Sequence, residues 1–132
     1  MDQEPWFLDI GQVDELHEAS LKAYGGTSGC RDRGLAESAL GAAQNTFFYG
    51  NGDHFDVAAA YAFHIAQAQA YLDGNKRTAI ATAIAFLAGN GFARIPTPAF
   101  LTELYEAMIA IADHRLDKPG LAKLMREFFT GA

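Results

Sequence analysis

The chain of 132 residues lacks most features of a secreted, membrane-bound or nucleic-acid-binding protein. It has a single cysteine, Cys30, so neither a disulfide framework nor a cysteine-based metal site is expected. No run approaches the ~18 apolar residues of a membrane span, and the acidic start of the chain has no signal-peptide layout. The net charge of −6 argues against a DNA-binding surface. These absences predict a soluble cytoplasmic protein with neither a membrane nor a DNA partner.

What the chain does contain is apolar sequence with helical spacing. Half of its residues are hydrophobic, which is enough for one buried core, and the length predicts a single domain over 1–132. Capping and breaker signals predict an all-α fold of about six helices. The first helix is expected from Asp9 to about Tyr24, and three more over about 34–47, 56–70 and 75–89. The last two are expected to begin at the prolines at 98 and 119. The helices over 56–70 and 75–89 are apolar nearly all round, which predicts two buried central helices.

The connection between these two central helices is unusually polar. It holds an acid, a glycine, an amide and two cations in consecutive positions, which are Asp73, Gly74, Asn75, Lys76 and Arg77. Backbone N–H groups at a helix N-terminus attract anions, but cations there oppose the helix dipole. An anionic ligand would reverse that penalty. The pattern favours a phosphate site, and a capped turn with solvated cations is the alternative.

The loop resembles the active-site motif of the Fic/Doc superfamily, in its death-on-curing (Doc-like) branch. That motif reads His-x-Phe-x-Asp-(Gly/Ala)-Asn-Lys-Arg, and the corresponding stretch is Gln69-Ala70-Tyr71-Leu72-Asp73-Gly74-Asn75-Lys76-Arg77. Segments 16–26, 31–40, 62–66 and 86–91 also resemble this branch, so the likeness covers about 7–129. It implies a single Fic/Doc-like domain with two buried helices flanking an active-site loop.

The resemblance also implies an activity and roles for the loop residues. Enzymes of this family move a phosphate-containing group from ATP to a protein hydroxyl. By resemblance, Asp73 holds Mg²⁺, the backbone amides of Gly74 and Asn75 cradle phosphate, and Lys76 and Arg77 bind phosphate oxygens. The implied cofactors are therefore ATP and Mg²⁺, and the catalytic set includes Asp73, Lys76 and Arg77.

Position 80 bears on which group is transferred. Longer Fic motifs carry a second arginine three positions after the first. This chain has Ile80 at that position. Doc-like members also lack the second arginine. In the family, this absence accompanies transfer of the γ-phosphate, whereas the second arginine accompanies AMP transfer (AMPylation). The likeness further implies a toxin–antitoxin pair, in which an antitoxin segment occupies a groove of the toxin. The protein substrate that it implies is a translation elongation factor.

Gln69 is the departure from the motif, because it stands where the family has its catalytic histidine. An amide can orient a hydroxyl but cannot accept its proton near neutral pH. Loss of a general base typically lowers the rate ~10²–10⁴-fold. The substitution is either natural, in a degenerate or repurposed member, or an introduced inactivation. A non-catalytic module that binds nucleotide or antitoxin is the alternative function.

The histidines do not form a metal-ligand pattern. His17 and His64 are interpreted as packed, structural residues, with His17 contacting the loop, and His114 as a surface residue. By resemblance, the turn around His54 is expected to form a flap that aligns the target. The aromatic residues at 47–49 are expected to pack at a helix end, and a groove for a partner is the alternative.

Overall fold

The computed structural model describes residues 4–131, which form six helices and no β-strand. In chain order the helices are α1 (Ile10–Tyr24), α2 (Arg33–Phe48), α3 (His54–Ala68), α4 (Asn75–Gly89), α5 (Pro98–Ala112) and α6 (Lys118–Thr130). The all-α prediction is therefore confirmed. The helix predicted over 56–70 begins at 54, because Asp53 provides its N-cap, and ends at 68, before Gln69 in left-handed conformation. Across residues 4–131, no helix combines the length and the apolar character that a membrane crossing requires.

Most of the helices begin at a side-chain cap. At the start of α1, α2, α3 and α6 an aspartate accepts a backbone N–H of the first turn, and the Thr97 hydroxyl does so at α5. The four capping carboxylates are those of Asp9, Asp32, Asp53 and Asp117. Of the six helices in the described residues, α4 alone has no side-chain cap, because its N-cap is Gly74. The first-turn N–H groups of α4 are thus left without a side-chain acceptor.

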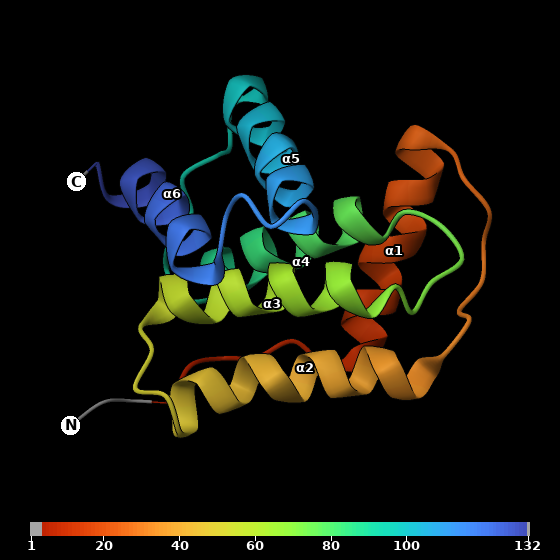
Figure 1. Cartoon of the computed structure of the whole chain (residues 1–132), viewed down its shortest axis with the longest axis horizontal. Helices are drawn as coiled ribbons and strands as arrows, with labels where there is room; N and C mark the ends of the chain where they lie inside the picture. Colours follow the sequence, from red (N-terminus) through yellow and green to blue (C-terminus); the bar gives the residue numbers. More distant parts are fainter. Residues whose placement is uncertain (1–3, 132) are drawn as a thin grey trace.

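The centre of the fold is α3, which packs along α2 and α4 and also contacts α5 and α6 (Figure 1). Eight of its 15 residues are buried, which is more than one helix face can account for. Alanines at 58–60 and 62 let the neighbouring helices approach closely. The two buried central helices lie side by side and are joined by the loop 69–74, as the sequence predicts.

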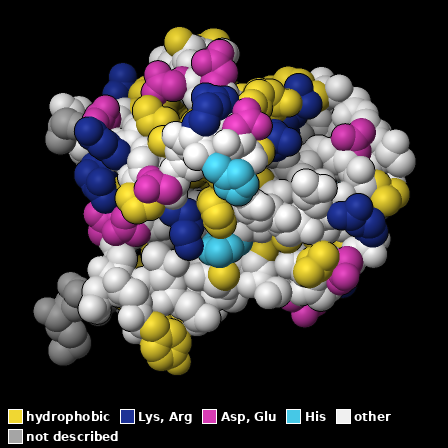
Figure 2. All heavy atoms as spheres, viewed as in Figure 1, with side chains coloured by type: hydrophobic (Ala, Val, Ile, Leu, Met, Phe, Trp, Pro, Cys, Tyr) yellow, Lys and Arg dark blue, Asp and Glu magenta, His cyan; other side chains and the backbone are white. Residues whose placement is uncertain are grey.

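Charged side chains do not gather by sign on the face seen in Figure 2. Lysine and arginine side chains there are interspersed with aspartate and glutamate side chains. One ion pair of the fold joins α6 to the start of α3, where the Arg126 guanidinium lies 2.9 Å from Asp53 Oδ2. This face therefore presents no continuous basic patch of the kind that binds a nucleic-acid backbone.

The segment before α1 is fastened to the end of α4. The Asn90 side chain accepts a hydrogen bond from the Trp6 backbone N–H and donates one to the Trp6 carbonyl, both at 2.9 Å. The Trp6 ring lies over Gly89, where a Cβ atom would stand 2.3 Å from Trp6 Cε3. Position 89 therefore has no room for a side chain.

We expect Gly89→Ala to lower the free energy of unfolding by about 1–3 kcal/mol, because the tryptophan ring must move. The matched control is Gly41→Ala on α2, where a new Cβ has no neighbour within 4 Å. An alanine in an open helix position stabilises it by roughly 0.5–1 kcal/mol relative to glycine. Thermal or urea unfolding of both variants measures the effect. Equal stabilisation of the two variants would contradict the contact between Trp6 and Gly89.

Candidate active site

The loop from α3 to α4 turns at two residues with left-handed backbone conformation. Gln69, the C-cap of α3, has φ 47° and ψ 44°. Gly74, the N-cap of α4, has φ 76° and ψ 18°. Glycine adopts this conformation without strain, and a Cβ at 74 would meet only ordinary van der Waals contacts. The requirement for glycine at 74 is therefore conformational rather than one of space.

The side chain of Asn75 fixes the loop from within. Its Oδ1 accepts the Tyr71 backbone N–H at 3.1 Å, and its Nδ2 donates to the Tyr71 carbonyl at 3.0 Å. An aspartate could not make the second bond, because a carboxylate has no donor. The sequence predicts a phosphate role for the Asn75 backbone amide, and the structure adds this structural role for its side chain.

A second segment, 25–32, lies along the loop. Leu72 donates its backbone N–H to the Gly29 carbonyl at 3.0 Å, and Arg31 donates its N–H to the Ala70 carbonyl at 2.6 Å. The Arg31 guanidinium also donates to the carbonyl of Gln69. A Cβ at Gly26 would come within 2.9 Å of Asp73 Oδ2, so glycine permits this close approach.

The expectation that the turn around His54 forms a flap at the site is wrong. His54 is the first residue of α3, and Gln69 follows the last residue of the same helix. They are 15 positions apart on this helix, which is about 22 Å along the axis. The His54 ring packs against Phe86 and Phe92 instead. The segment beside the loop is 25–32.

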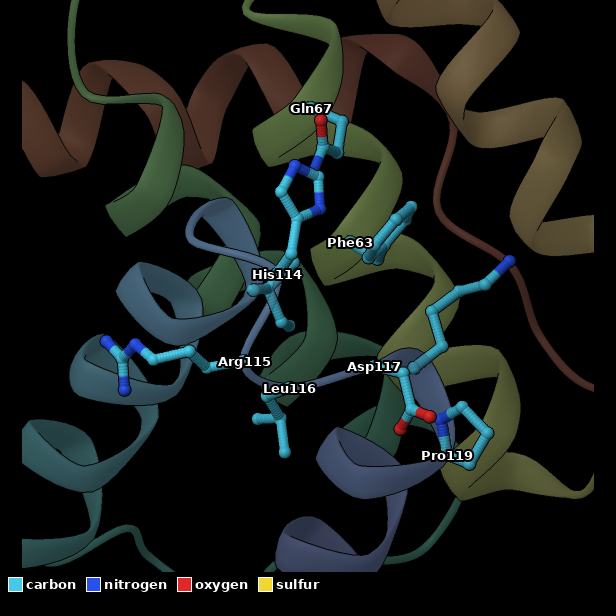
Figure 3. Close-up of a pocket in the computed structure, with 9 residues that line it drawn as sticks. Phe63, Gln67, His114, Arg115, Leu116, Asp117 and Pro119 are labelled. Carbon is cyan, nitrogen blue, oxygen red and sulfur yellow. The ribbon is translucent and has the colours of Figure 1, made fainter.

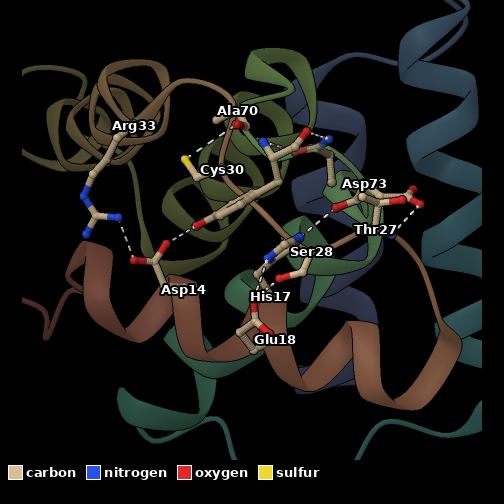
Figure 4. A network of polar contacts seen from close by, with 11 residues as sticks. Asp14, His17, Glu18, Thr27, Ser28, Cys30, Arg33, Ala70 and Asp73 are labelled. Atoms are coloured by element: carbon tan, nitrogen blue, oxygen red, sulfur yellow. Dashed lines mark hydrogen bonds and ion pairs between the residues drawn. The ribbon is translucent and has the colours of Figure 1, made fainter.

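Helix α1 contacts the loop through two buried rings, His17 on α1 and Tyr71 in the loop (Figure 4). His17 Nε2 donates to the Asp73 carbonyl at 2.7 Å, and its ring stacks on Tyr71 with centroids 3.9 Å apart. The Tyr71 hydroxyl donates to Asp14 Oδ1 at 2.6 Å, and Arg33 pairs with Asp14 Oδ2 at 2.8 Å. Burial, followed by the hydrogen bond to Asp14, raises the pKa of Tyr71. The expected structural role of His17 at the loop is confirmed.

The predicted site residues meet in one polar cleft of about 230 Å³. Its walls include all six predicted positions, namely Gln69, Asp73, Gly74, Asn75, Lys76 and Arg77, together with Ala66, Leu72 and Tyr105. Neither Lys76 nor Arg77 pairs with a carboxylate anywhere in residues 4–131. The cleft therefore combines two unneutralised cations with the uncapped N-terminus of α4, which is an anion-binding arrangement.

Asp73 is the acidic group of this cleft and is exposed to solvent. Its Oδ1 accepts the Gly74 N–H at 2.9 Å and its Oδ2 accepts the Thr27 N–H at 3.3 Å. Each oxygen keeps lone-pair capacity, and hard carboxylate oxygens suit Mg²⁺. No group of three or more metal-ligating side chains occurs among the described residues. With its remaining lone pairs, Asp73 fits a magnesium ion whose other ligands are phosphate oxygens and water.

No histidine side chain lines the cleft. His64 Nε2 lies 3.2 Å from Lys118 Nζ, and burial, followed by the lysine charge, lowers the pKa of this imidazole. His114 is exposed, as expected, and shares a separate cavity of about 720 Å³ with Phe63 and Gln67 (Figure 3). Neither imidazole lines the cleft that contains position 69.

An apolar groove of about 670 Å³ adjoins the cleft between α1, α4 and α5. Its lining includes Leu16, Ala19, Tyr24, Ile80, Ile84, Leu101 and Tyr105, and Arg77 stands at the boundary between groove and cleft. Ile80 therefore faces the groove. The apolar sequence of 75–89 predicted a buried helix but not this exposed groove, because the groove depends on where α1 and α5 lie.

Comparison with known proteins gives two matches that agree with this geometry. A model described as the Fic/DOC family matches residues 7–87, a range that holds α1, α2, α3, the whole loop and most of α4. The chain is also 32% identical over 118 residues to the protein kinase doc of Escherichia phage P1. That alignment covers 89% of this chain and 90% of the phage protein.

Proposed function

Because this chain belongs to the Fic/DOC family, we propose that its cleft binds the phosphates of ATP for transfer of a phosphate group to a protein hydroxyl. The domain would serve as the toxin component of a toxin–antitoxin pair. Gln69, which stands in the position of a general base, makes that transfer slow in the chain as it is. By resemblance, the protein target is a translation elongation factor.

The observation that carries this proposal is the uncapped N-terminus of α4 beside two unpaired cations. A cation in the first turn of a helix costs about 0.3–1 kcal/mol, because it opposes the helix dipole. Lys76 and Arg77 both lie in that turn without a carboxylate partner in residues 4–131. A polyphosphate would accept hydrogen bonds from the free N–H groups and neutralise both side chains at once. The arrangement is unfavourable without an anion and favourable with one.

The polar residues at 73–77 each have a role in this reaction. Lys76 supplies a point charge and Arg77 a planar pair of donors, while the amides after Gly74 orient phosphate oxygens. Asp73 would hold Mg²⁺ jointly with the phosphates. When bound, that ion neutralises phosphate charge. The target hydroxyl oxygen attacks the γ-phosphorus, the bond to the bridging oxygen breaks, ADP leaves, and the hydroxyl proton must pass to a base.

Two observations favour phosphate over AMP transfer. Ile80, in the position of the second arginine of longer Fic motifs, lines the apolar groove and offers nothing to a phosphate. The relative from Escherichia phage P1 is named a protein kinase. AMP transfer is the alternative, and labels at the α- and γ-phosphates of ATP distinguish the two reactions.

We expect Mg·ATP to bind the chain despite Gln69, because the phosphate-binding groups lie at 73–77. Titration calorimetry should give dissociation constants for this protein and for Gln69→His that agree within about threefold, which is less than 1 kcal/mol. If Gln69→His binds and the unaltered chain does not, binding and chemistry are not separable in this cleft.

A non-catalytic binding module is the second candidate, and the absence of an imidazole from the cleft favours it. Such a module would keep the groove and the phosphate site but transfer nothing. The two candidates differ in their response to a restored base. A dormant enzyme gains activity when position 69 becomes histidine, whereas a binding module does not.

We propose that the groove between α1, α4 and α5 receives an antitoxin segment that is helical when bound. Its apolar lining suits the apolar face of an amphipathic helix. Co-expression with the product of the neighbouring gene should raise the melting temperature, by on the order of 10 °C at 100 times the dissociation constant.

Leu101→Glu should abolish that shift, because Leu101 lines the groove and is 37% exposed. Ile109→Glu is the matched control, since Ile109 is on the same helix, is 38% exposed and does not line the groove. No shift with the unaltered chain and no co-purification would count against the toxin–antitoxin role.

A further inference from the structure

Arg77 is held by two aromatic rings instead of a carboxylate. Its guanidinium carbon lies 4.6 Å from the centroid of the Tyr24 ring and 5.3 Å from that of the Tyr105 ring. Tyr24 is near the end of α1 and Tyr105 is on α5, so two helices from outside the loop contribute to this arrangement. Tyr105 lines the cleft itself, and both rings line the neighbouring groove.

Aromatic rings hold a cation in a different way from a carboxylate. A carboxylate accepts the paired N–H donors of a guanidinium and neutralises its charge. A ring attracts the cation over its face and leaves both the charge and the in-plane donors available. An arginine that must bind phosphate therefore gains more from a ring than from an acidic partner. No acidic residue pairs with Arg77 within residues 4–131.

Core packing does not explain the Tyr24 ring. Its side chain is 66% exposed, so little apolar surface is removed from water at this position. A long charged side chain such as that of Arg77 loses rotamer freedom when it is fixed for a ligand. The two rings fix it before the ligand arrives, and such preorganisation lowers the entropy cost of binding.

We propose that Tyr24 and Tyr105 are positioning residues that hold the Arg77 guanidinium at the mouth of the cleft with its donors free for phosphate. This inference rests on the proposed function of the cleft as a nucleotide-phosphate site. It assigns a role to the aromatic faces and none to the tyrosine hydroxyls.

The test is titration calorimetry of Mg·ATP into the full chain and its variants. We expect Tyr24→Leu and Tyr105→Leu each to weaken binding about threefold, and the double variant roughly tenfold. Tyr24→Phe and Tyr105→Phe keep the ring faces and should bind as the unaltered chain does. Tyr49→Leu is the control for loss of an exposed tyrosine, because Tyr49 is 84% exposed at the C-cap of α2, away from Arg77.

A second series in the Arg77→Ala background separates positioning from direct contact with the nucleotide. If the rings act through Arg77, the double leucine variant has no further effect there, as a double-mutant cycle requires. A further tenfold loss in that background would overturn the inference, and so would phenylalanine variants as weak as the leucine ones. Leucine variants that bind normally would also overturn it and leave the proposed function intact. Absence of binding by the unaltered chain would instead refute the proposed function and this inference with it.

Discussion

Gln69→His is expected to raise the rate of phosphate transfer to protein by ~10²-fold or more, because general-base catalysis contributes at least that factor. In the proposed function, Lys76 and Arg77 neutralise phosphate charge and the loop amides position the phosphates. The missing component is a group that takes a proton near pH 7, and histidine supplies one with a reference pKa near 6.5. Initial rates of label transfer from γ-³²P-ATP into a cell extract measure the gain, and growth arrest on expression should follow the same substitution.

The backbone at position 69 suits histidine at least as well as glutamine. Gln69 has φ 47°, in the left-handed region, where histidine and asparagine occur several times more often than most residues. Gln69→Asn is therefore the matched control, since it suits the same backbone and has no basic nitrogen. Asparagine at 69 should leave the rate at the level of the unaltered chain. A gain with both residues would point to loop geometry rather than to a base.

The second large effect is expected at Lys76. Lys76→Ala should weaken Mg·ATP binding about tenfold or more, since a hydrogen bond to a charged group contributes about 1.5–3 kcal/mol. In the Gln69→His background it should abolish label transfer and growth arrest. Its effect on folding has the opposite sign, because removal of a first-turn cation relieves about 0.3–1 kcal/mol of unfavourable interaction with the helix dipole.

Lys123→Ala is the control for this substitution. Lys123 is an exposed residue of α6 and does not line the cleft. Its removal should change neither nucleotide binding nor transfer. If Lys123→Ala weakens binding as much as Lys76→Ala, the phosphate is attracted by overall charge, and the cleft is not the binding site.

Local signals predicted the helices and the position of the site. Gly74 and the polar run after it give α4 its start at Asn75, and apolar residues on all faces of α3 indicate its central place. The six site residues are close together in the chain, so a loop between two packed helices brings them together whatever the rest of the fold does. The sequence therefore sufficed for this part of the account.

Apart from the contact of His17 with the loop, contacts between distant segments were not predicted. The aromatic pair around Arg77 joins α1, α4 and α5, and the hydrogen bond from Tyr71 to Asp14 joins residues 57 positions apart. Periodicity carries no information about such pairs. The glycines of segment 25–32 partly indicated its conformation, since Gly25, Gly26 and Gly29 all have positive φ. That signal indicates an irregular segment but not its neighbour.

The central claim is that the cleft contains every part of a phosphate-transfer site except a base. Parallel assays of Gln69→His with γ-³²P-ATP and α-³²P-ATP test it most directly. The account predicts label in protein from the γ-position alone, and none in either assay when Lys76→Ala is added. Label from the α-position would mean AMP transfer. Absence of label from both positions, with growth unaffected and Mg·ATP still bound, would contradict the claim and leave the binding-module function.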